Sequence, residues 1–236
     1  MILDSFTQYK SIFQIQYSDA FEIWDRAGEI ARRLSDVWPN LKVKEGQPQI
    51  QVLGGEGVEI QTGFSKSTVT LSGAKAFEQR KVQQLKNTFE IWSELLKLDV
   101  LNRVSTRVVF VKHFDSIKEA NAAVFGLKLA RWPDSKVFDQ PQEADLNGLE
   151  IGYRFEDEQS FSLLRIKAEQ LSFEVDLDPY FLDEANIKKT KNRMVIDFDR
   201  GLLGKVKVGN IRVDEWIKGF QHLLHRDIEK VLKGQG

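Results

Sequence analysis

Val104-Ser105-Thr106-Arg107-Val108-Val109-Phe110-Val111 stands near the middle of the chain. β-branched residues fill most of its positions, and such residues favour strands, so this stretch predicts a strand. A long helix is expected before it, over residues 77–98, where apolar residues recur at helical spacing. A second helix is expected after it, because Ser116 and Glu119 form the signature of a capping box.

The N-terminal side of this stretch contains a similar series of elements. Alternation of apolar residues and glutamines predicts a strand over residues 13–17. Asp19 and Glu22 suggest a capped helix start, and Pro39 ends that helix after Trp38. Three short strands are then expected, at 50–52, 58–64 and 68–71. Gly54, Gly55 and Gly57 precede a strand and lack a Gly-Lys-Ser/Thr ending, so they predict a hairpin turn and not a phosphate loop.

The C-terminal side repeats the order. The helix that begins at Ser116 is expected to end near Trp132-Pro133, and a polar loop follows over residues 134–147. Strands are expected at 148–155, 161–167, 171–177 and 194–198, with a loop over 178–191. The last helix spans 213–232, because its apolar residues fall within one arc at 100° per residue.

The order strand–helix–strands–helix therefore occurs twice, and short strings support a duplication. Gly57-Val58-Glu59-Ile60 resembles Gly148-Leu149-Glu150-Ile151, and Trp38-Pro39 resembles Trp132-Pro133. We expect an α+β fold of two repeats, residues 1–103 and 104–236, related by a pseudo-twofold axis. Antiparallel sheets would carry the helices on one face and could merge into a single domain. This element order resembles the tandem repeats of the TATA-box-binding protein, which transfers no function by itself.

Composition and charge exclude several classes of protein. The 236 residues carry 34 Lys and Arg against 35 Asp and Glu, so no overall charge favours duplex nucleic acid or an anionic membrane. Absence of cysteine excludes disulfides and thiolate metal sites. No stretch approaches the 18 apolar residues of a membrane span, and residues 1–11 lack the apolar core of a signal peptide. The expected location is the cytoplasm, without membrane association.

The segment Leu101 to Phe110 resembles the strand that follows the long helix in a sporadically distributed, uncharacterised bacterial family of about this length. That family has an Arg–hydrophobic–Gly–x–Arg pattern at this place. Arg103 and Arg107 match it, whereas Ser105 replaces the glycine. The family has no assigned activity, and its patchy distribution implies an accessory role such as defence against mobile elements.

Arg103 and Arg107 lie four residues apart on the expected strand and therefore point to one face. Two guanidinium groups on one face would hold a phosphate or carboxylate through forked hydrogen bonds. The alternative is a solvated face, or ion pairs with internal acids such as Glu59 and Glu150. Only joint exposure of both guanidiniums would support an anion site.

Charge is balanced overall but segregated along the chain. Residues 188–212 contain eight basic and two acidic residues, and residues 139–158 contain seven acidic and one basic. Lys188, Lys189, Lys191 and Arg193 begin the basic segment and are candidates for binding an acidic partner or nucleic acid. The alternative is that the two segments face each other or are solvated.

Two pairs of aspartates alternate on expected strands, Asp176 with Asp178 and Asp197 with Asp199. Adjacent carboxylates can bind Mg²⁺ or share acid and base roles, but no spacing here matches a metal motif, and a solvated strand face explains it equally. His222 and His225 share a helix, most simply as a solvated face. We therefore expect no metal and no cofactor. The sequence favours a non-catalytic binding module with a protein partner, ahead of nucleic-acid binding through 188–212 and of metal-dependent hydrolysis at the paired aspartates.

Overall fold

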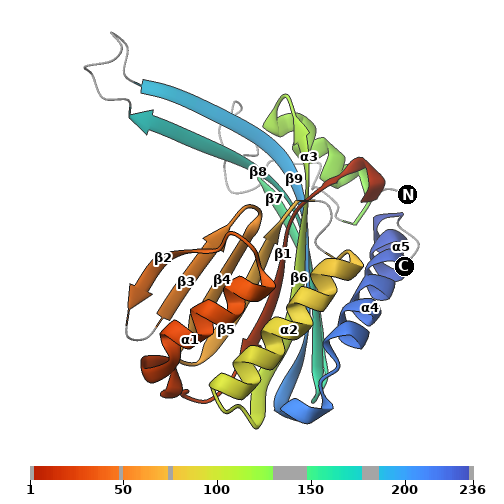
Figure 1. Ribbon diagram of the computed structural model, residues 1–236. Coiled ribbons are helices and arrows are strands. Elements are labelled where there is room, and N and C mark those ends of the chain that lie inside the picture. The colour runs from red at the N-terminus through yellow and green to blue at the C-terminus, as the bar shows by residue number, and fades with distance from the viewer. Residues whose placement is uncertain (1–2, 48–49, 74–76, 130–147, 177–185, 234–236) are drawn as a thin grey trace.

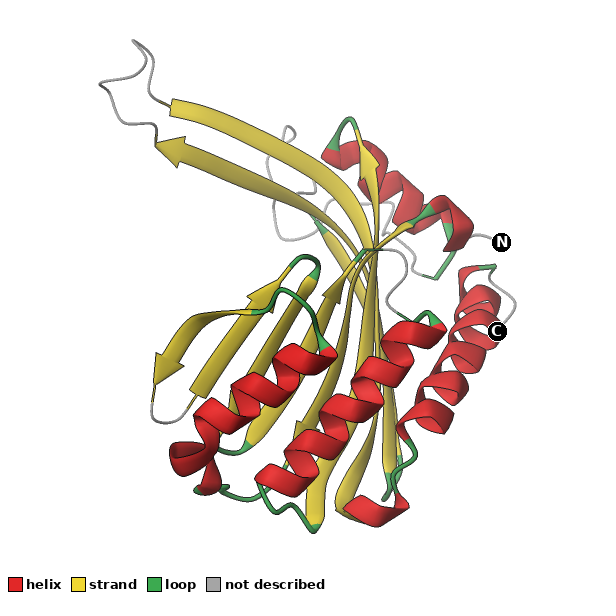
Figure 2. Cartoon of the chain, in the orientation of Figure 1, coloured by secondary structure: helices red, strands yellow, loops and turns green. Residues whose placement is uncertain are grey.

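The computed structural model describes residues 3–47, 50–73, 77–129, 148–176 and 186–233. Within them, nine strands form one antiparallel sheet, with helices packed against one of its faces (Figures 1 and 2). The strands are β1 (Thr7–Gln16), β2 (Lys42–Gln47), β3 (Ile50–Gly55), β4 (Val58–Gly63), β5 (Lys66–Ser72), β6 (Val100–Phe114), β7 (Leu149–Glu156), β8 (Ser160–Asp176) and β9 (Asn186–Lys207). The helices are α1 (Glu22–Val37), α2 (Gln79–Leu95), α3 (Ile117–Gly126), α4 (Val213–Leu223) and α5 (Glu229–Leu232). The fold is thus α+β.

The sheet is continuous across the two expected repeats. Its strand order is β2-β3-β4-β5-β1-β6-β9-β8-β7, and β1 pairs antiparallel with β6 at the centre. The expected boundary between residues 103 and 104 falls within β6. The two halves therefore share one sheet.

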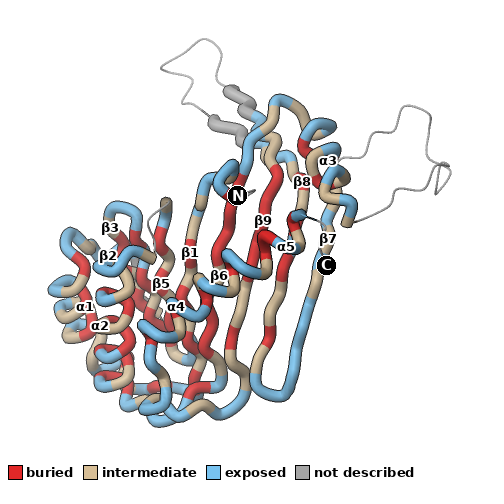
Figure 3. Tube along the Cα trace, turned by 90° about the vertical axis from the view of Figure 1, so that its right-hand side faces the viewer, coloured by how far each residue is buried: buried red, intermediate tan, exposed pale blue. Residues whose placement is uncertain are grey.

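Alternation along the strands places one set of side chains under the helices and the other on the opposite face. Phe13 and Ile15 of β1 pack with α1 and α2 in one core cluster. Val108 and Phe110 of β6 pack with α3 and α4 in a second. Buried residues run along the central strands (Figure 3). The face opposite these helices is here named the open face.

Several expectations for the N-terminal half are confirmed. Helix α1 ends at Trp38, whose backbone N–H donates to Leu34, and Pro39 prevents its continuation. The strand pair β4 and β5 lies where it was expected. The capped start at Asp19 was wrong: Phe21 occupies the N-cap position and no side chain caps the helix. Strand β2 was missed, because its lysines and glycine give no apolar alternation.

The C-terminal half differs more from the expectations. Ser116 caps α3 as predicted, its hydroxyl accepting the backbone N–H of Glu119 at 3.1 Å, but α3 ends at Gly126. The end expected at Trp132-Pro133 lies outside the described residues. Two separate strands were expected where β8 is continuous, and a loop was expected where β9 begins. All of β8 pairs with residues 186–202 of β9, so the pair extends beyond the end of β6, and that long-range pairing has no local signal.

The last helix is interrupted. A π-helical turn, Leu224–Ile228, separates α4 from α5. Such turns insert one extra residue into the hydrogen-bond ladder and are frequent at functional sites. After it, Glu229 accepts a hydrogen bond from the backbone N–H of Leu3 at 2.8 Å, which ties the C-terminal helix to the N-terminal segment.

The matching strings that suggested a duplication lie on strands in different positions. Counted outward from the central pair, β4 is the third strand of its half and β7 is the fourth. Gly57 and Gly148 are therefore not in equivalent places, although both begin a strand. Trp132 lies outside the described residues, so its comparison with Trp38 does not apply here.

Three tryptophans anchor helices to their surroundings through buried threonines. Trp38 donates its indole N–H to Thr88 of α2 at 2.8 Å, Trp92 donates to Thr62 of β4 at 2.9 Å, and Trp216 donates to Thr106 of β6 at 2.8 Å. Each ring fills space between a helix and its neighbour while its polar atom stays satisfied.

Replacing Trp38 with alanine should lower the free energy of unfolding by about 3–5 kcal/mol, because the ring is 1% exposed. Trp24 is the matched control, since its ring is 54% exposed, and Trp24→Ala should cost less than about 1.5 kcal/mol. Urea unfolding followed by far-UV circular dichroism measures both. Equal losses for the two variants would contradict the assigned core.

Candidate functional site

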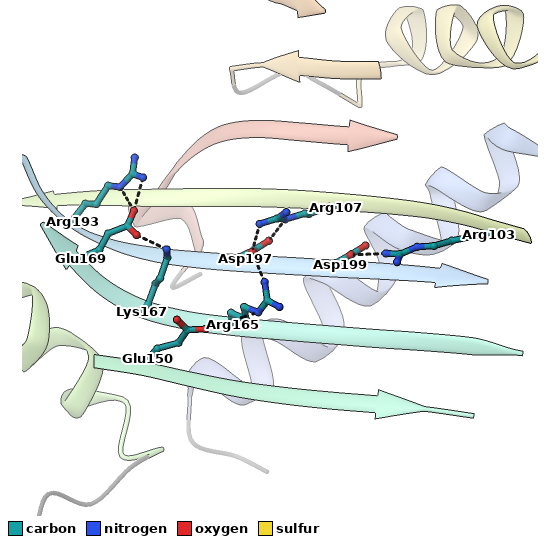
Figure 4. Close-up of polar contacts among 9 residues, drawn as sticks. All are labelled: Arg103, Arg107, Glu150, Arg165, Lys167, Glu169, Arg193, Asp197 and Asp199. Carbon is teal, nitrogen blue, oxygen red and sulfur yellow. Dashed lines mark hydrogen bonds and ion pairs between the residues drawn. The ribbon is translucent and has the colours of Figure 1, made fainter. Parts of the chain in front are cut away.

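The open face of the C-terminal half carries a network of charged side chains that crosses β6, β7, β8 and β9 (Figure 4). The network consists of Arg103, Arg107, Glu150, Arg165, Lys167, Glu169, Arg193, Asp197 and Asp199. These residues share the alternation phase that points away from the helices, since Val104 and Val108 lie beneath them. This network is the candidate site.

Arg107 and Asp197 form the centre of the network. The Nε and Nη2 atoms of Arg107 each donate to one oxygen of Asp197 at 2.6 Å, a forked pair. The Asp197 side chain is 8% exposed and that of Arg107 is 39% exposed. A carboxylate this buried needs a fixed counter-charge, and Arg107 supplies it with good geometry. Arg165 approaches the same carboxylate at 4.0 Å from β8.

Arg103 forms a second pair one step along the strands. Its Nη2 donates to Asp199 at 3.0 Å, and its guanidinium lies 4.3 Å above the ring of Phe161. That ring covers Gly201, where any side chain would meet it and would also stand 2.8 Å from the carbonyl oxygen of Val104. Glycine therefore makes room for the phenyl ring, and the ring supports the arginine.

The two pairs differ in how completely their atoms are satisfied. Both oxygens of Asp197 accept hydrogen bonds. Asp199 Oδ1 and Arg103 Nε are buried and have no hydrogen-bond partner. Burial raises the pKa of Asp199 above its ordinary value, more than Arg103 and Arg107 lower it. The Asp199 end of the network therefore retains an unused acceptor and an unused donor.

The network continues along β8 and β9 to Glu169 and Arg193 (Figure 4). Arg193 donates to Glu169 at 2.7 Å and lies over the ring of Tyr9, 5.6 Å from its centroid. Lys167 also pairs with Glu169. Burial acts to raise the pKa of Glu169, but the hydrogen bonds from Lys167 and Arg193 outweigh it, so this pKa lies below its ordinary value. Glu150 of β7 lies 3.9 Å from Arg165.

The predicted arginine pair is therefore found together on one face, but not in the predicted state. An anion site required two unpaired guanidiniums, and each is held by an internal carboxylate. The partners are Asp197 and Asp199, not the Glu59 and Glu150 suggested as alternatives. The sequence placed both pairs of residues on strand faces, but only the pairing of β6 with β9 brings them into contact.

The basic segment 188–212 is spread along one strand. It follows β9 from residue 188 to the end of the strand at Lys207 and ends at Arg212, immediately before α4. Lys188 and Lys189 stand opposite Glu174 and Phe173 in the paired ribbon, Lys191 stands opposite Leu171, and Arg193 is paired with Glu169. Arg200 points to the helix side, one residue out of phase with Asp199. Arg193 and Arg200 point to opposite faces of β9, which does not favour one continuous basic patch along the whole segment.

The paired aspartates do not form a metal site in the described part of the chain, where no group of three metal-binding side chains is found. Asp197 and Asp199 share a face as predicted, but arginines hold them. Asp178 lies outside the described residues. A divalent ion at Asp197 would have to displace Arg107 from both oxygens, so these carboxylates give little support to metal-dependent hydrolysis.

Neither a family model nor a curated protein matches the chain. Among the described helices, none is long and apolar enough to span a membrane.

Single substitutions should separate the two carboxylates of the network. Asp197→Asn removes a buried forked ion pair and should lower the free energy of unfolding by about 2–3 kcal/mol at neutral pH. Asp199→Asn should cost less than about 1 kcal/mol, because it removes a charge that burial already disfavours. Urea unfolding of both variants tests this, and a larger loss at Asp199 would contradict the assignment.

The raised pKa of Asp199 also predicts a pH effect. The folded state binds the Asp199 proton more tightly than the unfolded state, so this group favours folding below its unfolded pKa. This favourable contribution is lost as the pH rises through the higher pKa that Asp199 has in the folded state. The stability of the wild-type protein relative to Asp199→Asn should therefore fall as pH rises through this window. Unfolding measured from about pH 3.5 to 7 checks the sign, and an opposite slope would overturn it.

Proposed function

We propose that this protein is a non-catalytic binding module whose open face is a platform for a protein partner. One observation carries the proposal: the described helices all pack on one face of a nine-stranded sheet, and none of them covers the other face (Figure 1). Sheet faces not needed for the core are available for recognition.

The composition of the open face favours a protein over a polyanion. Its C-terminal half presents paired positive and negative groups, and its N-terminal half presents polar groups together with the exposed ion pair of Lys44 and Glu59. Among the polar groups, Gln14 of β1 lies opposite Thr68 of β5, and Gln16 lies opposite Lys66. A surface of balanced charge does not gain affinity from the release of phosphate counterions. Internal pairing also holds the side chains in place, so less conformational entropy is lost when a partner binds.

The family proposal rests on the same strand. We infer membership of the sporadically distributed bacterial family from Arg103 and Arg107, with the departure at Ser105. Both arginines form ion pairs in the open-face network. Arginines kept at these two positions would therefore keep those ion pairs. An accessory role, such as defence against mobile elements, is part of this proposal.

A duplication is proposed from the order of the strands. From the centre outward, β1 is followed by β5, β4 and β3, and β6 is followed by β9, β8 and β7. In each half, the strand that comes first in the chain lies at the centre of the sheet. The last strand of that half lies beside it, and the earlier strands follow outward. This supports two repeats with an element order similar to that of the TATA-box-binding protein, with β2 present only in the first. The better correspondence matches β4 with β8, and not with β7 as the sequence strings suggested.

A photo-crosslinking residue at Gln14 tests the platform. Gln14 lies on the open face of β1, and Glu90, exposed on α2, is the matched control on the helix side. After irradiation in the native cell, the Gln14 variant should give a protein conjugate of discrete mass, absent from the Glu90 variant and resistant to nuclease. Conjugates of equal yield at both positions, or none at Gln14, would contradict the proposal. A nuclease-sensitive conjugate would favour nucleic-acid binding instead.

A further inference from the structure

A groove lies on the helix side of the sheet, opposite the candidate site. It has a volume of about 330 Å³ and opens between the C-terminal helix and the strands β7, β8 and β9. This volume is near the lower end of small-molecule sites, about 300–1,000 Å³. Its walls are mainly apolar and include Leu164, Phe198 and Ile228; its polar residues are Ser162, Arg200 and Asp227.

Arg200 occupies a place that the rest of its strand gives to apolar residues. On the helix side of β9, the buried residues Met194, Ile196 and Phe198 precede it at alternate positions. Continuing that alternation places Arg200 under the C-terminal helix, where it is partly buried. A guanidinium in such surroundings costs free energy unless an anion accompanies it.

Within the described residues, no carboxylate forms an ion pair with Arg200. Its Nη1 donates to the neutral hydroxyl of Ser162 at 3.0 Å. Asp227 lines the same groove, but Arg226 holds both of its oxygens, at 2.6 and 2.8 Å. Backbone hydrogen bonds from Gln159 and Ser160, with a smaller contribution from the charge of Arg200, hold the pKa of Asp157 below its ordinary value, but Asp157 forms no ion pair with Arg200. The arginines of the open face, in contrast, all have carboxylate partners.

Two further features mark the groove as a site. The π-helical turn Leu224–Ile228 forms part of its wall and turns Asp227 toward Arg226. Phe155 of β7 lines the groove with a ring that is 68% exposed. An exposed phenyl ring beside an apolar groove leaves surface that a ligand would remove from water.

We propose that this groove binds a small amphiphile that carries a carboxylate. Its head would accept forked hydrogen bonds from Arg200 and one from Ser162, and its apolar body would lie against Leu164, Phe198 and Ile228. The carboxylate would supply the direct ion pair that Arg200 lacks among the described residues, and the groove is too small for a long lipid. This inference does not depend on the proposed role of the open face.

Calorimetric titration of the full chain with decanoate and with 1-decanol tests the head group, since the two probes share the same apolar chain. We expect decanoate to bind at least tenfold more tightly than decanol. Equal dissociation constants, or no binding of decanoate at millimolar concentration, would overturn the proposal.

Two arginine variants then locate the site. Arg200→Met keeps an unbranched, flexible side chain but removes its charge, and it should abolish the preference for decanoate while decanol still binds. Arg154→Met is the matched control, because Arg154 lies on the open face of β7, paired with Glu156, and its variant should retain the full preference. A preserved preference in Arg200→Met, or a loss in Arg154→Met, would place the ligand elsewhere.

The stability of the variant provides a second readout. Because Arg200 forms no ion pair with a carboxylate in the described part of the chain, Arg200→Met should melt at or above the wild-type temperature without ligand, and decanoate should raise the melting temperature of the wild type only. If Arg200→Met fails to fold, then Arg200 is structural and the proposal is wrong. Phe155→Ala, at the exposed end of the groove, should weaken both probes by a similar factor.

Discussion

The antiparallel pairing of β1 with β6 is the constraint on which the rest of the structure depends. It joins strands from the two halves of the chain and so makes one sheet out of two sets of strands. Phe13 and Ile15 on one side of this seam, with Val104 and Val108 on the other, place apolar residues under the helices. A shift of register by one residue would turn these residues to the open face and the arginines of β6 into the core. The helices α1, α2 and α4 then cover the apolar face, and three tryptophan–threonine hydrogen bonds hold α2 and α4 to the sheet and the end of α1 to α2.

The same alternation determines how charge is distributed in the C-terminal half. Odd-numbered residues of β6 and β9 meet on the open face, where Arg107 and Asp197 neutralise each other. Buried charges of this kind are tolerated only as satisfied pairs, which explains the forked geometry. Arg200 is one residue out of phase with them and reaches the helix side, where it donates a hydrogen bond to the hydroxyl group of Ser162. One long strand therefore presents directly paired charges on one face and, on the other, an arginine without an ion pair among the described residues.

These two faces suggest two separate activities on one scaffold. The open face is broad and balanced in charge, which is typical of a surface for a macromolecular partner. The groove at Arg200 is small and mainly apolar, which is typical of a site for a small ligand. The C-terminal helix, which lines the groove, also packs on β9, whose other face carries Asp197 and Asp199. A ligand in the groove and a partner on the open face would therefore contact opposite sides of the same strand.

By itself, the sequence determined most of the elements and which residues of a strand share a face, although it indicated neither β2 nor the start of β9. Local signals were sufficient for the elements that were predicted: β-branched runs for β6, the Ser116 cap of α3, Pro39 after α1, and the spacing that placed Arg103 with Arg107. Only the tertiary structure decided what those residues contact, because partners such as Asp197 are 90 residues away in the chain. It also decided the length of β8 and β9, which depends on their mutual pairing, and the π-helical turn, which no periodicity in the last helix reveals. Pairing across the sheet is a long-range property, so composition and spacing could place the arginines on one face but could not show whether their charges were free.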